Sequence, residues 1–270
     1  MLSDGHIQKT EVIAGGILFL IILGTALCAP FITPNSPLAL DLSNTLAPPS
    51  IHYPMGTDQL GRCVFSRVIY GARISVSGAV IASLLSLLLG FIIGIGAASG
   101  RSRLARVLTG LIDMAFALPG LIVALVCAGL LGASVQSLVA GLVMGAWPWW
   151  ARLIRGLILS AREKEFVLAG QVAGISHGRL LTRYLLPQLK GPVLTALALK
   201  TGWIILAFSG LSYLGLGPAP PTPEWGSMLQ EAAIFMTQAP WLMIAPGMAV
   251  TLTVLSLNLI GEGLGGNEPE

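Results

Sequence analysis

Hydrophobic residues gather in six long runs along the chain, and the segments between them are rich in proline or in basic residues. Each run is close to the roughly 20 apolar residues that an α-helix needs to cross the hydrocarbon core of a bilayer. Pro119 and Pro148 interrupt two runs, which a helical bundle tolerates because neighbouring helices satisfy the freed backbone groups. The pattern therefore predicts an all-α membrane protein with about six transmembrane helices. The predicted spans are residues 12–29, 74–98, 108–131, 135–157, 193–214 and 241–260.

Composition agrees with this pattern. Hydrophobic residues make up 54% of the 270 residues, charged residues only 10%, and the mean hydropathy is +0.83. Since soluble domains carry about 25% charged residues, this chain lacks the charge to cover a water-facing surface. We expect residues 1–11 to form a cytoplasmic N-terminus and residues 12–270 to form one transmembrane domain.

The distribution of lysine and arginine predicts the orientation, because cytoplasmic loops carry an excess of both. With the N-terminus in the cytoplasm, three arginines fall outside, Lys200 falls within the fifth run, and eleven of the fifteen basic residues fall inside. We therefore expect both termini in the cytoplasm. The eleven are Lys9, Arg101, Arg103, Arg106, Arg152, Arg155, Arg162, Lys164, Arg179, Arg183 and Lys190.

The first run follows Lys9 and has an alternative interpretation as a signal peptide. The sequence Ala-Leu-Cys-Ala at 26–29 is a poor small-x-small cleavage site. We expect the run to remain in the protein as its first span.

The loop at 162–190 is the substantial polar segment between spans on the predicted cytoplasmic side. Phe166, Ala169, Gly170 and Ala173 recur at helical spacing and share one face, and three of the four are small enough for another surface to approach closely. The following Gly174 suits a turn with positive φ. A second helix then fits until Pro187 stops it. The loop is predicted to be a helix–turn–helix along the membrane, where a cytoplasmic partner acts.

This loop resembles the cytoplasmic signature loop of bacterial ABC-importer permeases, with the pattern Glu-x-x-x-Ala-(Ala/Gly)-x-x-x-Gly followed by Leu-Pro. In that family the loop is a coupling helix that sits in a cleft of the ATPase subunit. Gly170 stands where alanine is usual. The resemblance places the coupling role on Glu165, Ala169, Gly170, Gly174, Ile175, Ser176 and Pro187.

Segments elsewhere narrow the resemblance to the dipeptide, oligopeptide and nickel permeases. They are Gly-Thr-Asp-Gln-Leu-Gly-Arg at 56–62, Leu-Ser-Tyr-Leu-Gly-Leu-Gly at 211–217, Pro-Glu-Trp-Gly at 223–226 and Asn-Leu-Ile-Gly-Glu-Gly-Leu at 258–264. Two departures stand out: Cys63 replaces the usual aspartate, and the tail at 265–270 is short and lacks an Arg-Asp pair.

The resemblance implies a permease subunit of a binding-protein-dependent importer in the bacterial cytoplasmic (inner) membrane. Its partners would be a second, homologous permease in a heterodimer, two cytoplasmic ATPases, and a periplasmic or lipid-anchored solute-binding protein. The chain has no Gly-x-x-x-x-Gly-Lys-Ser/Thr loop, so it is not expected to be an enzyme, and ATP-Mg would bind the ATPase partner. The substrate remains open between di- or oligopeptides and nickel or a metal chelate.

Lys200 is the unusual residue of the spans, because an ionised group in the membrane is costly and often functional. It either lines the translocation path, pairs with an acid of the partner permease, or extends to the cytoplasmic interface on its long stem. Trp147, Trp149 and Trp150 precede Arg152, which favours interfacial anchoring. Arg179 and Arg183, four residues apart, have an alternative role as anchors to lipid headgroups.

Other classes fit less well. A secondary transporter needs intramembrane acids or an inverted repeat, whereas Asp113 and Glu262 are expected near span ends. An intramembrane enzyme needs paired acids or His-Glu-x-x-His within a span. His6, His52 and His177 lie outside the spans, so no metal site is predicted. No stretch interleaves basic and aromatic residues as a nucleic-acid surface would, so the sequence gives little support to nucleic-acid binding.

Overall fold

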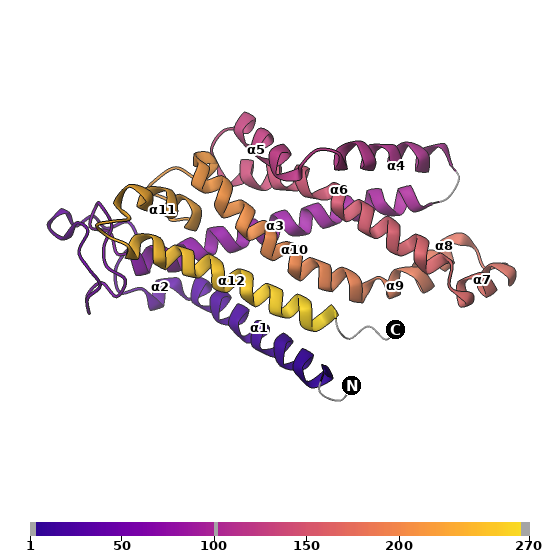
Figure 1. The fold of residues 1–270 in the computed structure, drawn as a ribbon, viewed down its shortest axis with the longest axis horizontal. Helices are drawn as coiled ribbons and strands as arrows, with labels where there is room; N and C mark the ends of the chain where they lie inside the picture. The colour runs from indigo at the N-terminus through magenta and orange to yellow at the C-terminus, as the bar shows by residue number, and fades with distance from the viewer. Residues whose placement is uncertain (1–3, 100–101, 266–270) are drawn as a thin grey trace.

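A computed structural model describes residues 4–99 and 102–265 as an elongated bundle of helices (Figure 1). Among these residues the β-structure is limited to an isolated bridge between Thr57 and Cys63. The helices are α1 (Asp4–Leu27), α2 (Ala29–Ile32), α3 (Val64–Ala98), α4 (Arg103–Phe116), α5 (Gly120–Leu131), α6 (Val135–Arg162), α7 (Glu165–Val172), α8 (His177–Leu180), α9 (Leu186–Gln188), α10 (Lys190–Leu211), α11 (Trp225–Ala232) and α12 (Trp241–Gly265). Short turns of other helix types are η1 (Leu42–Asn44), η2 (Leu181–Leu185), η3 (Ser212–Leu216) and η4 (Ala233–Phe235).

Four helical segments among the described residues are long and apolar enough to cross a membrane: Gln8–Leu27, Val64–Ala98, Lys190–Leu216 and Trp241–Gly265. They coincide with the first, second, fifth and sixth predicted spans. The second begins at Val64 rather than at 74, so α3 is 35 residues long. The extra turns contain Arg67, which is buried and paired with acidic groups from other segments. α6 is 28 residues long but less apolar, because tryptophans and arginines replace aliphatic residues from Trp147 onward.

The third predicted span, over 108–131, is not one continuous helix. The region forms α4 and α5, which meet at a bend of 85°. Pro119 is the N-cap of α5, and proline disfavours helical backbone in the residue before it, so the chain breaks at 117–119. If the bent pair counts as one span, the described residues contain up to five apolar spans.

α3 is the central helix, and α6 and α10 both pack along it. The contact with α6 depends on small residues: a Cβ added to Gly94 would lie 2.8 Å from the Ala151 carbonyl oxygen. On the other side, a Cβ at Gly78 would lie 2.7 Å from the ring of Phe208 in α10. Small residues allow such close approach between membrane helices, whose association depends on van der Waals packing.

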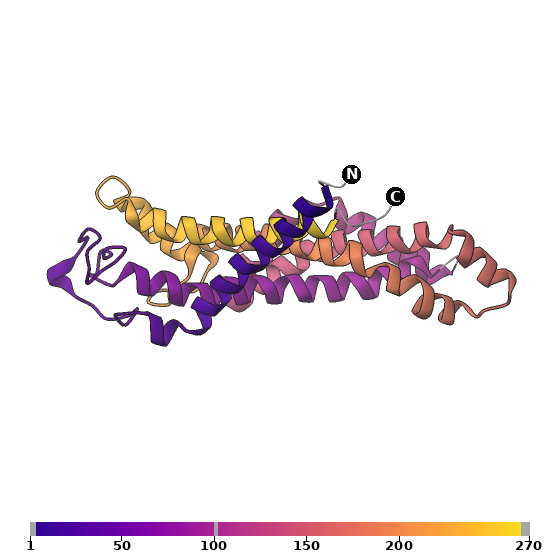
Figure 2. The same ribbon diagram turned by 90° about the horizontal axis from the view of Figure 1, so that it is seen from below.

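α1 lies at the edge of the bundle and crosses it obliquely (Figure 2). It packs on α12, where Cβ atoms added to Gly15 or Gly263 would come within 2.6 Å of the Ser256 and Gln8 carbonyl oxygens respectively. The first span is therefore held by close backbone contacts to the last one.

The two ends of the bundle differ (Figure 1). The segments at 33–63 and 217–240, with α11, gather at one end, and α7 and α8 project from the other. The first turn of α1 and the last turn of α12 lie toward the α7 end. Arg101 and the tail departure at 266–270 lie outside the described residues.

Candidate coupling loop and membrane cavity

The predicted helix–turn–helix of the loop is confirmed. α7 ends at Val172, the chain turns through residues 173–176, and α8 begins at His177. Gly174 has φ +77°, a region that costs other L-residues roughly 1–2 kcal/mol. The amide of Ile175 closes the turn by donating to the carbonyl oxygen of Gly170 at 3.0 Å. A Cβ built on Gly174 would have no neighbour within 4 Å among the described atoms, so the turn faces outward.

α7 presents apolar side chains to its surroundings. Phe166 is 42% exposed and Val172 is 91% exposed, and Ala169 and Ala173 are also exposed. Gly170 departs from the predicted common face: it is half-buried, and a Cβ there would lie 2.9 Å from Leu180 Cδ2 of α8. An exposed apolar patch on a polar segment is typical of a surface that contacts another protein or a membrane.

The remaining residues of the predicted coupling set lie around this patch. Glu165 is exposed and makes no hydrogen bond or ion pair with a described residue. It lies in the first turn of α7, where a negative charge is favourable. Ile175 is half-buried. The carbonyl oxygen of Ser176 accepts from the Leu180 amide at 3.0 Å and starts α8.

Pro187 does not stop the helix after the turn, contrary to the prediction. The chain continues as the π-helical turn η2 and then as α9, with Pro187 in the first turn of α9. Proline is tolerated there because the first amides of a helix have no intrahelical acceptor. In η2 the Leu186 amide donates to the Leu181 carbonyl oxygen, and this wider turn carries the chain into α10.

The base of the loop is fixed to the bundle. Val167 of α7 is buried in a cluster with residues of η2, α3 and α6. Lys164 Nζ also donates to Gln188 Oε1 at 3.1 Å, which joins the two ends of the loop. The loop is therefore connected to α3 and α6 by close packing. The cluster consists of Ala98, Ile154, Ile158, Ala161, Val167, Leu185 and Leu189.

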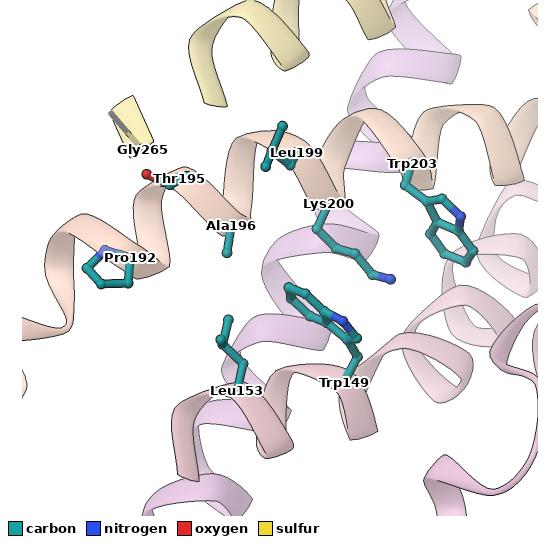
Figure 3. Close-up of a pocket in the computed structure, with 9 residues that line it drawn as sticks. All are labelled: Trp149, Leu153, Pro192, Thr195, Ala196, Leu199, Lys200, Trp203 and Gly265. Carbon is teal, nitrogen blue, oxygen red and sulfur yellow. The ribbon is translucent and has the colours of Figure 1, made fainter. Parts of the chain in front are cut away.

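Lys200 lies on α10 beside a cavity of about 490 Å³ (Figure 3). Its Nζ is 4.0 Å from the ring centroid of Trp203 and 4.9 Å from that of Trp149, on α6. The cavity continues toward Pro192 and Gly265 along α10 and the end of α12. Lysine and two indoles from two helices thus meet beside one cavity, with Trp203 39% exposed.

The tryptophans of α6 do not form the predicted interfacial group. Trp150 is fully buried and Trp147 is nearly so, and both pack against α3. Trp149 is turned to the cavity beside Lys200. The reason is their position: they stand near the middle of the 28-residue α6.

Asp113 is a helix-end charge, as expected. It lies near the C-terminal end of α4, at the bend between α4 and α5. Arg152 Nη2 donates to Asp113 Oδ1 at 3.0 Å, and the Arg152 guanidinium lies 4.0 Å from the ring centroid of Phe116. Both charged side chains are more than half exposed. The acid is thus paired with an arginine of the neighbouring helix.

A buried charge network at the opposite end of the bundle was missed by the sequence analysis. Arg62 Nε donates to Asp58 Oδ2 at 2.6 Å, and Arg62 Nη2 donates to Glu231 Oε2 at 2.9 Å. Arg67 Nη2 donates to the same Glu231 oxygen at 3.2 Å. The spacing of Asp58 and Arg62, four residues apart in a chain poor in charge, was the available signal. The partner Glu231 is distant in sequence.

At the same end of the bundle, Glu224 joins α3, η3 and α11 through hydrogen bonds. Its carboxylate is fully buried and accepts from Ser75 Oγ of α3 at 2.8 Å, from Ser212 Oγ of η3, and from the Gly226 and Ser227 amides at 2.9 Å. It caps α11 while joining α3 and η3 to it. The motifs at 56–62, 211–217 and 223–226 therefore stabilise one assembly of three segments at the end of the bundle opposite α7.

Among the described residues, no group of three or more His, Cys, Asp or Glu side chains could hold a metal ion.

Comparison with known families identifies a match over residues 86–266, to the family described as the inner membrane component of binding-protein-dependent transport systems. The matched region runs from the middle of α3 to the end of α12 and includes the loop.

Curated proteins match almost the whole chain. A peptide transport system permease protein of Brucella suis is 37% identical over 93% of this chain and 84% of its own. The dipeptide transport system permease protein DppC of Alkalihalophilus pseudofirmus is 33% identical over 93% and 83%. The nickel transport system permease protein NikC of Escherichia coli K12 is 34% identical over 88% and 86%.

A solved structure supports the fold. The inward-facing methionine ABC transporter MetNI aligns with a TM-score of 0.60 and 14% identity, over 72% of this chain and 93% of that chain. At this identity the similarity concerns the fold alone.

Proposed function

Because this chain belongs to the family of inner-membrane components of binding-protein-dependent transport systems, we propose that it serves as a permease subunit importing di- or oligopeptides. The family places it in the bacterial inner membrane as a multi-pass protein. ATPase activity in such systems resides in separate subunits, so this chain conducts the solute and does not hydrolyse ATP.

The contact with the ATPase is assigned to the loop around Gly174. The observation that carries this assignment is the outward-facing glycine turn beside exposed Phe166 and Val172. Because the base of the loop packs onto α3 and α6, a displacement of the turn is transmitted to these helices. ATP-Mg would bind the ATPase subunits. The proposed contact set is Glu165, Ala169, Gly170, Gly174, Ile175, Ser176 and Pro187.

The proposed assembly contains a second, homologous permease in a heterodimer, two cytoplasmic ATPases and a periplasmic or lipid-anchored solute-binding protein. In this arrangement residues 12–270 form one domain with six spans, the bent α4–α5 pair and α6 included, and both termini lie in the cytoplasm. Support comes from the bundle itself: α7, α8 and the basic residues around them lie at the end opposite the 33–63 and 217–240 segments (Figure 1).

Transport then follows from a shift between two packings of the bundle. ATP closes the ATPases, and their differential contact with the loop favours one packing over the other. The π-helical turn η2 lies between α8 and α9, where the loop joins α10. Because Lys200 lies on α10, movement of the loop is transmitted to the cavity.

Peptides are the preferred substrate because the Brucella suis and Alkalihalophilus relatives, both named for peptide transport, match 93% of this chain. Nickel or a metal chelate is the second candidate, supported by the Escherichia coli relative at similar identity.

The test is uptake by proteoliposomes that contain this permease, its permease partner and both ATPases, with the binding protein outside. We expect ATP-dependent accumulation of a labelled dipeptide. Accumulation of radioactive Ni²⁺ in place of the peptide selects the second candidate. Uptake that continues without the ATPases contradicts the importer assignment.

A further inference from the structure

Among the residues that the structure describes, Lys200 has no anionic partner. It lies ten residues after the start of α10, roughly 15 Å along the helix, and so well inside the span. Its ammonium group has three donors, yet it makes no hydrogen bond or ion pair with any described residue. Arg152, another cation of this region, is already paired with Asp113.

The side chain of Lys200 does not extend to the cytoplasmic interface. Its Nζ approaches the ring of Trp203, three residues further along α10 and away from Lys190, where α10 begins (Figure 3). The indoles of Trp203 and Trp149 attract the cation through their negative faces. They hold the ammonium beside the cavity but supply no acceptor for its N–H groups, so it can bind an anion.

Two cavities meet at this cation. The first, of about 490 Å³, is lined by residues of α6, α10 and the end of α12. The second, of about 250 Å³, extends to the α4–α5 bend around Pro119 and Gly145. Trp149, Lys200 and Trp203 line both. The first volume lies within the usual range for small-molecule sites. Space of solute size therefore adjoins Lys200 on two sides.

On the basis of the proposed peptide import, we propose that Lys200, Trp149 and Trp203 form a carboxylate-binding site on the translocation path. This site binds the C-terminal carboxylate of a peptide in transit. The ammonium binds the carboxylate by charge-assisted hydrogen bonds, which are stronger in a site poor in water. The indoles contact the apolar part of the peptide. A bare divalent cation is repelled by the same group.

An acidic side chain of the second permease is another source of a carboxylate. The free dipeptide and its amide distinguish the two sources, because loss of a salt bridge to the second permease would affect uptake of both substrates alike.

The test compares uptake of a dipeptide with its C-terminal amide in the reconstituted importer, for the wild type, Lys200→Met and Lys200→Arg. The same binding protein is used throughout. Its own preference between the free dipeptide and the amide therefore cancels when the ratio of their uptake rates is compared between variants. We expect Lys200→Met to reduce free-dipeptide uptake about tenfold, the scale of one charged hydrogen bond, and to leave the amide unchanged. Lys200→Arg should keep most of the preference. Lys190→Met, an exposed lysine at the start of the same helix, is the matched control.

Equal loss of both substrates in Lys200→Met indicates a pair with the second permease and overturns the proposal, as does no loss of either. If Lys200→Met does not assemble with the ATPases, Lys200→Gln gives the same ratio with a polar side chain. Failure of the wild type to import either dipeptide with ATP would contradict the proposed function instead, so the two failures are distinguishable.

Discussion

Arg62 Nη2 lies 2.9 Å from Glu231 Oε2, and this contact joins the segment before α3 to α11 across 169 residues of sequence. Arg67 donates to the same oxygen, and Asp58 accepts from Arg62. The positive charges of the two arginines are therefore balanced by the negative charges of the two acids. The side chains of Arg62 and Arg67 are almost completely buried. The network fixes the start of α3 relative to the 33–63 segment and α11.

Glu231→Gln should destabilise the protein, because it leaves two buried guanidinium groups with one acid. Loss of one partner of a buried pair costs about 3–5 kcal/mol. Thermal unfolding in detergent measures the effect. Glu163→Gln, at an exposed site at the end of α6, is the control and should change little.

The same network predicts non-additivity. Arg67→Met removes the excess positive charge, so the pair Glu231→Gln and Arg67→Met should lose less stability than the sum of the single variants. Strict additivity would show that these charges do not act as one network.

Gly90→Ala should weaken the packing of α6 on α3. A Cβ on Gly90 would lie 2.8 Å from the Ala151 amide and 2.9 Å from the Trp147 carbonyl oxygen, and backbone atoms cannot move aside cheaply. Overpacking of this kind typically costs about 1–3 kcal/mol. Gly156→Ala is matched, because it is also helical but has open space, and it should be neutral or slightly stabilising. Equal melting temperatures for the two variants would contradict the close contact.

Asp41, in the segment at 33–63, is an acid with a depressed pKa. Hydrogen bonds from the side chains of Ser43, then Asn44 and Tyr53, lower its pKa to about 2. A group with a depressed folded pKa contributes stability above its unfolded pKa of about 3.9, and this contribution is lost as the pH falls through about 2. Tyr53→Phe removes one donor and should raise the Asp41 pKa, which moves the loss to higher pH.

Carbon-13 NMR of labelled aspartate, titrated from pH 5 to pH 2, measures this change directly. Asp41→Asn identifies the resonance. An Asp41 pKa that is the same with and without the Tyr53 hydroxyl group would contradict the hydrogen bond of 3.0 Å between them.

The sequence predicted what depends on local pattern. The apolar runs gave the main helices, and the helical spacing around Ala169 with Gly174 gave the helix–turn–helix and its positive φ. Proline effects were harder to predict, because the outcome depends on position. Pro119 was expected to interrupt its span, but the size of the bend, 85°, was not predicted, and Pro187 began a helix that it was expected to end.

Contacts between distant segments could not be predicted in this way. Glu231 and Glu224 meet partners more than one hundred residues away, and no local period encodes such pairing. The direction of Lys200 likewise depends on Trp149, which belongs to another helix. Position in the sequence showed that Lys200 was unusual, but only packing showed which way it points.

Co-purification in detergent with the ATPase subunits shows whether the ATPase docks on the Gly174 turn. Gly174→Arg and Gly132→Arg are compared, because both glycines have positive φ and open space for a Cβ, at +77° and +85°. Gly132 lies at the far end of α5, away from the loop. We expect Gly174→Arg to lose the ATPases while Gly132→Arg and the wild type retain them. Retention of the ATPases by Gly174→Arg, or equal loss in both variants, would contradict docking at this turn.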